Sequence, residues 1–506
     1  MEVPVLIVGA GPTGLVLALW LTQFGIRVRI IDQSSKSGET SRAIAVQART
    51  LEYYQQIGLA NDVVAGGIKV AVGNVRKNNH TIAKLPFADM GKGLSPFPFV
   101  LSFPQDDHEK VLIAHLERLG VKVERNTELV GFNQDKDFVT ATLKSGEKTE
   151  TVKAAYLCGC DGARSTVRTT LGIGFPGGTY NHIFYVADVS ATTAVDIDNL
   201  QMCLSKHGFT LVVAVRSSGS FRLIGLVPPE CDKKDITQIK FDDVAATVAR
   251  DTDVKISKVN WFSTYHVHHR VADHFRVERV FLLGDAGHIH SPAGGQGMNT
   301  GISDAVNLAW KLAAVLQCRA ANSILDSYEI ERIAFARKLV STTDKLFQLM
   351  TDSGGIGYVW RNIFLPVVAP ILFKFHLVTR GFFKMISQIE IKYRESPLSQ
   401  GVAGKIHAGD RLPWVMYDSK DNFKCLESLD WQAHVYGAAT PGLKIALGLA
   451  KVSLHEFVWN DKTNAAGLLK DALYLVRPDG YVGMAESEQN VEKLQQYLTH
   501  HGIVTR

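Results

Sequence analysis

The stretch Val280-Phe-Leu-Leu-Gly-Asp-Ala-Gly-His-Ile-His-Ser-Pro-Ala-Gly-Gly-Gln-Gly-Met-Asn299 decides the fold of this chain. It begins with four apolar residues, a run typical of a strand that is buried on both faces. A glycine-rich loop follows, and from Asn299 to Leu316 apolar residues recur at helical spacing. A strand, a glycine loop and a helix start predict several free backbone N–H groups that can hold negative charge. The stretch therefore predicts a ligand site, although a mere tight turn would use the same residues.

Length and charge narrow the possible classes of protein. The chain has 506 residues, 46% of them hydrophobic, which exceeds one ordinary core and predicts two or three domains. The net charge is only +5 and no Lys/Arg-rich run or zinc-finger spacing is present, so nucleic-acid binding is not expected. Six cysteines without a CxxC pair favour a reducing, cytoplasmic setting.

The N-terminus has the pattern of a dinucleotide-binding βαβ unit. The apolar run Pro4–Val8 leads into Gly9-Ala-Gly-Pro-Thr-Gly14, and a second apolar run, Ile26–Ile31, ends in Asp32. In this GxGxxG turn the first glycine makes the tight turn, the second admits a pyrophosphate, and the third lets helix and strand pack. An acid at the Asp32 position takes ribose hydroxyls, which favours FAD or NAD. The glycines also interrupt the apolar N-terminus, so neither a signal peptide nor a membrane span is predicted.

A second acid and glycine follow another expected strand. The run Ala154–Gly159 predicts that strand, and Cys160-Asp-Gly-Ala-Arg-Ser-Thr-Val-Arg168 comes directly after it. Ligand-type residues therefore follow three strand ends, near residues 9–14, 161–162 and 284–297. Because such ends lie along one edge of a doubly wound sheet, we predict that they line a single long cofactor.

These three motifs resemble those of the FAD-dependent aromatic hydroxylases of the para-hydroxybenzoate hydroxylase type. Their order and separation also fit, and the C-terminal tail makes the chain similar to the longer branch that contains phenol hydroxylase and the aromatic-polyketide hydroxylases. The resemblance implies FAD as the cofactor and NADPH or NADH as a transient co-substrate, without a second Rossmann domain. The motifs and the resemblance together predict these cofactor-binding residues: Gly9, Gly11, Pro12, Thr13, Gly14, Asp32, Arg42, Gln105, Asp161, Arg164, Gly284, Asp285, Pro292, Gly295, Gly297, Met298 and Asn299.

The resemblance also implies which part of the cofactor each group of residues holds. N–H groups at the start of the Asn299 helix would stabilise the negative charge that reduced flavin develops at its pyrimidine end. By position, Asp32, Arg42 and Gln105 would hold the adenosine and phosphates, Asp285 the ribityl and pyrophosphate part, Pro292 and Gly294–Asn299 the isoalloxazine ring, and Asp161 and Arg164 both FAD and NADPH.

The predicted fold class is α/β, in three parts. A Rossmann-like FAD-binding domain would take residues 1–75, 100–175 and 270–400. Strand-like runs indicate an antiparallel-sheet substrate domain made of residues 76–99 and 176–269. The resemblance implies a thioredoxin-like C-terminal domain at residues 402–506; Cys425 is its only cysteine, so no dithiol activity is expected.

Aromatic residues in the substrate domain are candidates for the wall of a pocket over the flavin. They are Trp261, Phe262 and Tyr265, to which the resemblance adds Pro292. The alternative is that each aromatic residue packs the sheet against helices.

Two other features do not predict a site of their own. His266, His268 and His269 could suggest a metal site, but His266 and His268 share one face of a strand without a nearby carboxylate or cysteine ligand, and flavin chemistry needs no metal, so none is expected. The uncharged run Asn362–Phe373 is short and holds two prolines, so buried or interfacial helices are expected there and not a membrane span.

The resemblance implies a flavoprotein monooxygenase. NAD(P)H would reduce FAD, O₂ would give a flavin C4a-hydroperoxide, and its distal oxygen would pass to a phenolic or polycyclic aromatic, polyketide-like ring. The catalytic residues are unknown: where the phenol-hydroxylase pattern has an acid, this chain has Ala43-Ile44-Ala45. Baeyer–Villiger oxygenation, oxidation that inactivates an antibiotic, and a non-catalytic FAD-containing binding protein remain alternatives. The sequence also leaves a homodimer open.

Overall fold

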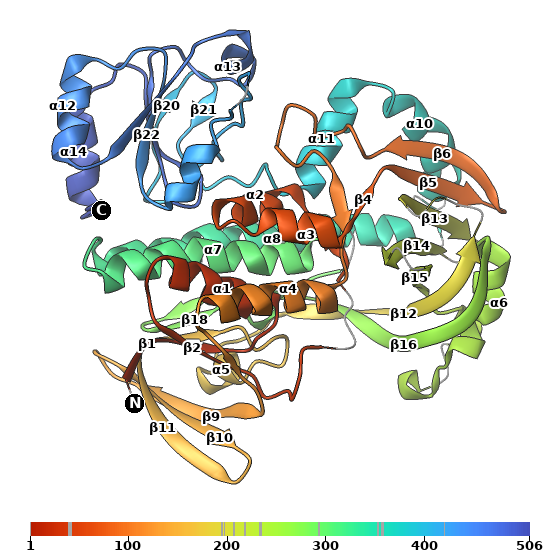
Figure 1. Cartoon of the computed structure of the whole chain (residues 1–506). Helices are drawn as coiled ribbons and strands as arrows, with labels where there is room; N and C mark the ends of the chain where they lie inside the picture. Colours follow the sequence, from red (N-terminus) through yellow and green to blue (C-terminus); the bar gives the residue numbers. More distant parts are fainter. Residues whose placement is uncertain are drawn as a thin grey trace.

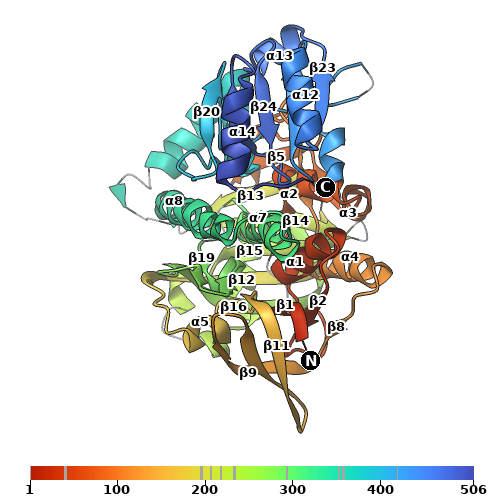
Figure 2. The same cartoon turned by 90° about the vertical axis from the view of Figure 1, so that its left-hand side faces the viewer.

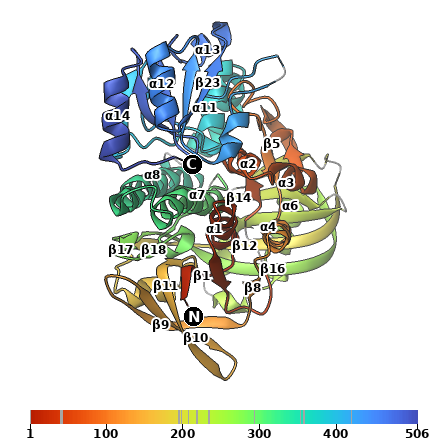
Figure 3. The same cartoon turned by 60° about the vertical axis from the view of Figure 1, so that its left-hand side comes forward.

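The computed structural model describes residues 2–38, 43–193, 196, 198–205, 208–216, 219–231, 235–291, 294–351, 354–355, 359–418 and 420–505. Two long helices, α7 (Gly297–Leu316) and α8 (Asp326–Thr351), run through the middle of the molecule (Figure 1). Figures 2 and 3 show these helices between the C-terminal part of the chain and the two larger sheets. The helix that begins at the glycine loop is therefore a central element of the fold.

The first sheet contains the N-terminal βαβ unit. Its parallel part has the order β8-β2-β1-β11-β18, and β9, β10 and β17 extend it through antiparallel pairs. Helix α1 (Pro12–Gln23) is buried from Gly14 to Leu21, because the sheet covers one side and α7 packs on another. The strands are β1 (Glu2–Val8), β2 (Val28–Ile31), β8 (Val123–Glu124), β9 (Thr127–Gln134), β10 (Val139–Ser145), β11 (Lys148–Gly159), β17 (Arg276–Val277) and β18 (Val280–Leu282).

The second sheet has the order β19-β16-β12-β15-β14-β13-β5-β6 within the described residues. It is antiparallel except where β13 pairs with β5 in parallel, a pairing that brings two distant segments together. The strand-like runs expected from the sequence are parts of longer strands, and β13 was not expected. The strands are β5 (Val72–Lys77), β6 (His80–Pro86), β12 (Gly177–Thr193), β13 (Asn199–Ser205), β14 (Gly208–Arg216), β15 (Ser220–Leu226), β16 (Val254–Val271) and β19 (His288–Ile289).

The C-terminal part builds a third sheet, in the order β21-β20-β25-β24-β22-β23. Some of its apolar residues, such as Leu412 and Tyr474, form a buried cluster of the tail's own. Others share the core of the body, because Trp431 and Leu475 belong to the same buried cluster as Leu6 of β1 and Ala309 of α7. The tail is therefore packed into the body of the protein. Its strands are β20 (Gln400–Ala403), β21 (Ile406–His407), β22 (Gln432–Tyr436), β23 (Ser453–Phe457), β24 (Leu473–Val476) and β25 (Val482–Glu486).

A separate small sheet of β3 (Ala45–Val46), β7 (Val100–Ser102) and β4 (Ile68–Val70) packs against β14 of the second sheet. Among the described residues, no single helix is long and apolar enough to cross a membrane. The other helices are α2 (Ala48–Gln56), α3 (Ala60–Gly66), α4 (Gln105–Arg118), α5 (Thr166–Thr170), α6 (Phe241–Asp251), the π-helix η5 (Trp360–Val368), α10 (Ala369–Leu372), α11 (His376–Ile386), α12 (Pro441–Leu449), α13 (Asp461–Ala465) and α14 (Val491–His500), with short 3₁₀ turns between them.

Candidate active site

Four strand ends lie in one row of the first sheet. The register pairs Ile31 with Val8, Val8 with Gly159, and Gly159 with Leu282, so β2, β1, β11 and β18 end side by side. The residues that follow these ends carry Asp32 and the three motifs. The structure thus brings the motifs to one edge of the sheet, the edge at which open α/β sheets bind their ligands.

The glycines of the first motif have different roles. An added Cβ would lie 2.3 Å from the Cys160 oxygen at Gly9 and 2.0 Å from the Gly9 oxygen at Gly14, so the backbone leaves no room at either position. At Gly11 the same atom would meet no protein atom within 4 Å. Gly11 is also the N-cap of α1, and no side chain caps that helix. The open side of the loop therefore offers backbone N–H groups to a phosphate.

Pro12 and Thr13 serve the packing of α1. Pro12 is at the first position of the helix, where its fixed φ is favourable. A Cβ built at Gly284 would lie 2.7 Å from Thr13 Oγ1, and one built at Gly301 would lie 2.3 Å from it. The start of α1 therefore touches both the third motif and α7 through this threonine.

Asp32 is held firmly at the end of β2. Its Oδ2 accepts a hydrogen bond from Ala10 N at 2.7 Å, its Oδ1 accepts one from Ser34 N at 2.8 Å, and Arg125 Nη1 lies 3.7 Å from Oδ1. The side chain is 15% exposed, which leaves part of the carboxylate free to meet ribose hydroxyls. Arg125 carried no sequence signal, because only the fold brings the segment after β8 to this place.

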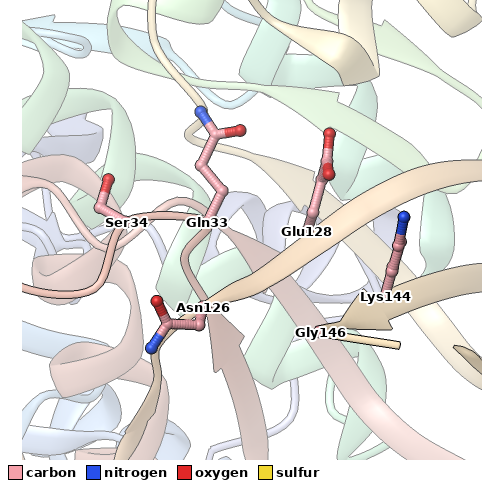
Figure 4. Close-up of a pocket in the computed structure, with 6 residues that line it drawn as sticks. All are labelled: Gln33, Ser34, Asn126, Glu128, Lys144 and Gly146. Carbon is pink, nitrogen blue, oxygen red and sulfur yellow. The ribbon is translucent and has the colours of Figure 1, made fainter. Parts of the chain in front are cut away.

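A surface hollow of ≈ 420 Å³ opens next to the loop that follows Asp32. Its polar lining, with charges of both signs, suits a nucleotide base or sugar better than an apolar ligand. Figure 4 shows its lining residues, which come from the loop after β2 and from the β9–β10 arm: Gln33, Ser34, Asn126, Glu128, Lys144 and Gly146.

Gln105 is the first residue of α4 and faces the loop after β2. Its Nε2 donates to Glu109 Oε1 at 2.8 Å, and Glu109 Oε2 accepts from Gly38 N at 3.3 Å. Burial raises the pKa of Glu109 above its ordinary value. The predicted phosphate partner Arg42 lies outside the described residues.

The second motif caps the N-terminus of α5 and is hydrogen-bonded to the third motif. Asp161 Oδ2 accepts from Val167 N at 3.1 Å, whereas its buried Oδ1 has no partner among the described residues, and burial raises the pKa of this acid. Arg168 Nη1 donates to the Ala286 oxygen at 2.8 Å. Arg164 is exposed. Arg168, which the sequence did not single out, therefore ties the two motifs together.

The third motif rests on a buried ion pair. Asp304 of α7 accepts hydrogen bonds from Gly284 N at 2.9 Å, His288 Nε2 at 2.7 Å and Arg332 Nε at 2.5 Å. Burial alone would raise the pKa of Asp304, but Arg332 and His288 lower it below its ordinary value. This support leaves Asp285 exposed at the end of β18.

The loop before α7 is fixed by Asn299. Its Oδ1 accepts from Gln47 N at 2.9 Å and Thr50 Oγ1 at 2.8 Å, and its Nδ2 donates to the oxygens of Ala45 at 2.9 Å and Gly295 at 3.0 Å. All of its side-chain hydrogen-bonding capacity is thus used inside the protein, so a ligand could meet only its backbone. Pro292 lies outside the described residues.

Backbone donors gather where α7 begins. The helix starts at Gly297, followed by the half-buried Met298, and no side chain caps its first turn. Nearby, His290 donates from Nδ1 to the Ser291 oxygen at 2.7 Å, which leaves its buried Nε2 as a lone pair without a partner among the described residues. Burial lowers the pKa of His290 to about 4, so the ring is neutral at pH 7.

The three aromatic candidates divide between the two faces of the second sheet. Tyr265 packs with Phe184, their ring centroids 6.0 Å apart, on the face that meets α8. Trp261 lies opposite Asp188 in the register, and residues paired across strands share a face. Phe262 instead packs on the other face, against α6. Phe262 therefore packs the sheet against a helix, which was the alternative to a place in the pocket wall.

A buried ion pair on the same face as Tyr265 carried no sequence signal. Arg222 of β15 donates to both oxygens of Asp188 on β12, at 2.7 Å each, and its Nη1 donates to the Ala43 oxygen at 3.2 Å. The pair therefore connects the face of the second sheet to the start of the Ala43-Ile44-Ala45 segment.

These features fit a long dinucleotide cofactor. Gly11 leaves room for a pyrophosphate, the starts of α1 and α7 present uncapped N–H groups, and Asp285 is exposed. The buried acceptors on Asp161 and His290 that lack partners would gain donors from such a ligand. Among the described residues, no group of three or more His, Cys, Asp or Glu side chains could hold a metal ion.

Comparisons with known proteins agree with this site. Residues 2–343 match the family model of the FAD binding domain. A flavin-dependent monooxygenase of Mycobacteroides abscessus is 32% identical, over 96% of this chain and 98% of its own. A 6-methylpretetramide 4-monooxygenase of Streptomyces rimosus is 34% identical, over 80% of this chain and 73% of its own. The structure of OxyS anhydrotetracycline hydroxylase from Streptomyces rimosus superimposes with a TM-score of 0.79, at 28% identity, over 100% of both chains.

The family match covers more than half of the chain, and the full-length structural match includes the C-terminal part. The predicted α/β fold class and the resemblance drawn from the three motifs are thereby confirmed. The chain belongs to the FAD-binding-domain family of flavin-dependent monooxygenases.

Proposed function

We propose that the chain uses NAD(P)H and O₂ to hydroxylate a phenolic ring of a polycyclic, polyketide-like aromatic substrate. One observation carries this proposal: β19, which belongs to the third motif, pairs with β16 at the edge of the second sheet. The loop that leads into α7 therefore starts from the sheet that carries the aromatic face. This arrangement supports a site in which the substrate ring lies between that face and the reacting end of the cofactor.

The same proposal assigns the cofactor site. When bound, FAD supplies the redox chemistry that couples NAD(P)H oxidation to activation of O₂. Gly11 and the start of α1 would meet the pyrophosphate, and the first N–H groups of α7 would stabilise negative charge on the flavin. Asp161 and Arg164 would contact both FAD and the nicotinamide co-substrate. The remaining proposed FAD contacts are Asp32, Arg42, Gln105, Asp285, Pro292, Gly295 and Gly297.

The aromatic face of the second sheet would hold the substrate. Phe347 of α8 lies over Phe184 with a centroid distance of 5.4 Å and over Tyr180 with one of 4.1 Å. Such a surface binds flat rings by stacking and keeps water away from the reacting atoms. We propose that the chain has three domains: one binds the cofactor, one binds the substrate, and the third is the C-terminal tail. We further propose a cytoplasmic enzyme, in keeping with six free cysteines, and a homodimer.

Anaerobic flavin reduction by NADPH or NADH tests the proposal. Reduction should be slow in the enzyme alone and many-fold faster with the right member of a panel that runs from single-ring phenols to polycyclic quinones, because the site is completed by the substrate. In air, the same compound should gain one atom from labelled O₂ and none from labelled water. Fast reduction without any aromatic compound, with peroxide as the only product, would contradict the proposal.

The products separate the alternatives. An ester formed beside a ketone would indicate Baeyer–Villiger oxygenation. Loss of antibacterial activity in an oxidised antibiotic would indicate a resistance function. Bound flavin without NAD(P)H turnover in the presence of any panel member would indicate a non-catalytic binding protein.

A further inference from the structure

The segment from residue 359 to 386 presents an apolar surface to solvent. It contains η5, α10 and α11, and Figure 1 shows α10 and α11 at the margin of the molecule, next to β5 and β6. Large apolar residues recur every four positions along the first two helices, so they share one helical face. Their exposed fractions, with those at the bend that follows, are Val359 50%, Ile363 50%, Val367 56%, Ile371 55%, Phe375 60% and Leu377 85%.

The opposite sides of these helices are packed against the protein. Ala369, Phe383 and Ile386 are buried, and Leu365 joins a small cluster with residues of the second sheet. The exposed residues are therefore a second, outward apolar face. Soluble proteins rarely leave so many large apolar side chains together in water, which indicates a binding surface.

The charges of this segment all have one sign. Residues 359–386 include four Lys or Arg residues and no Asp or Glu. Lys374 is exposed beside Phe375, and Arg380 Nη1 donates to the Lys92 oxygen at 3.5 Å. Among Lys374, Arg380 and Lys384, the cations of this segment whose side chains the structure describes, Lys384 is paired with an acid, Glu390 at 3.1 Å. A binding partner that fits this segment has an apolar region next to negatively charged groups.

We propose that this segment docks the protein on an anionic lipid surface, with the apolar side chains in the boundary layer and the cations at the headgroups. The helices Ile363–Leu372 and Leu377–Ile386 are bent by 114°, so they suit a surface-lying pair. A second copy of the chain fits less well, because a two-fold contact would bring the same cations face to face. The inference does not depend on the proposed reaction.

Vesicle flotation of the full-length, FAD-loaded protein tests this inference. It should float with vesicles of equimolar phosphatidylcholine and phosphatidylglycerol, but not with phosphatidylcholine alone, and added salt should weaken the binding. The double substitution Ile371→Glu and Leu377→Glu should weaken binding about tenfold or more, because it removes apolar contact and adds like charge. Lys374→Glu alone should weaken it about fivefold or more.

The C-terminal tail offers a matched control on α12. Ile445 and Leu449 of α12 are 66% and 80% exposed, so Ile445→Glu with Leu449→Glu changes surface apolarity and charge equally but should leave flotation unchanged. FAD content and thermal stability of each variant establish that it is folded. The proposal is overturned if the wild type fails to float with anionic vesicles or if both the double variant and Lys374→Glu float like the wild type. If light scattering without vesicles showed that the wild type is a dimer and the double variant a monomer, the face would instead bind a second copy of the chain.

Discussion

At the scale of the residue, substitutions at Gly11 and Gly14 should distinguish an effect on cofactor binding from an effect on folding. A methyl group at Gly11 meets no protein atom within 4 Å, whereas one at Gly14 lies 2.0 Å from the Gly9 oxygen. Gly11→Ala should therefore keep the stability of the FAD-free protein but weaken FAD binding about tenfold or more, because the methyl group takes the space of the pyrophosphate. Gly14→Ala should lower the melting temperature of the FAD-free protein as well. Fluorescence titration with FAD and thermal unfolding measure the two effects.

Gly442→Ala in α12 is the control for the change from glycine to alanine, since a Cβ there also meets no protein atom within 4 Å. It should leave FAD binding unchanged. Undiminished FAD affinity in Gly11→Ala would mean that the first motif does not hold the pyrophosphate.

At the scale of the element, Asn299 joins the first turn of α7 to β3 and α2. Asn299→Ala would leave buried donors on Gln47 and Thr50 without their acceptor, at a cost of about 1–3 kcal/mol in the free energy of unfolding. The loosened loop should also let more NAD(P)H oxidation end in peroxide, because the loop no longer excludes water well. Denaturant unfolding and the ratio of peroxide to hydroxylated product measure these changes.

Thr50→Val removes one of the bonds to Asn299 and keeps the other three, so its effects on stability and on peroxide should be in the same direction but smaller. If Asn299→Ala made peroxide at the wild-type ratio, the loop would not control the coupling of the reaction.

The motifs were predictable because each is a local pattern: strand, glycine turn and helix follow one another along the chain. Their convergence followed from the parallel order of the strands. Contacts between distant segments were not predictable, such as the pair Asp188–Arg222 or the support of Asp304 by Arg332. Strand alternation puts Phe262 on the face opposite Trp261 and Tyr265, because the register of β12 and β16 is continuous over these residues. Which of the two faces meets α6 was not predictable, since that contact depends on a distant segment.

At the scale of the whole molecule, buried ion pairs lock the tail to the central helices. Glu331 of α8 accepts from Arg477 of the tail at 2.7 Å and from Lys311 of α7 at 2.8 Å, all with side chains 0% exposed. Glu331→Gln should lower the free energy of unfolding by about 3–5 kcal/mol, because it leaves buried cations unpaired. Urea unfolding at neutral pH measures this loss.

The pH dependence should follow the same pair. Burial alone would raise the pKa of Glu331, but Arg477 and Lys311 lower it well below its ordinary value. A carboxylate with a lowered pKa stabilises the fold fully at a pH above its ordinary pKa. This contribution disappears as the pH falls from the ordinary pKa through the lowered one. The difference in stability between wild type and Glu331→Gln should therefore shrink in acid. A difference independent of pH would show that the ion pair is not the cause.

The tail should have a structural role and no thiol chemistry. Cys425 is its only cysteine, and burial raises the pKa of this thiol to about 12. Cys425→Ala should leave turnover unchanged, whereas deletion of residues 403–506 should abolish soluble expression, because it uncovers the buried charges on α7 and α8. A truncated protein that folds and merely changes its substrate preference would contradict this view.

The buried seam between tail and body also bears on how such proteins evolve. Arg411 pairs with Glu52 of α2, and Asp479 accepts hydrogen bonds from Arg477 and from the indole of Trp310 on α7. A chimera that carries the tail of another family member would bury charges without their counterparts unless α2, α7 and α8 were exchanged with it. The tail should therefore be exchangeable between family members only together with these three helices, although α2 and the tail lie far apart in the sequence.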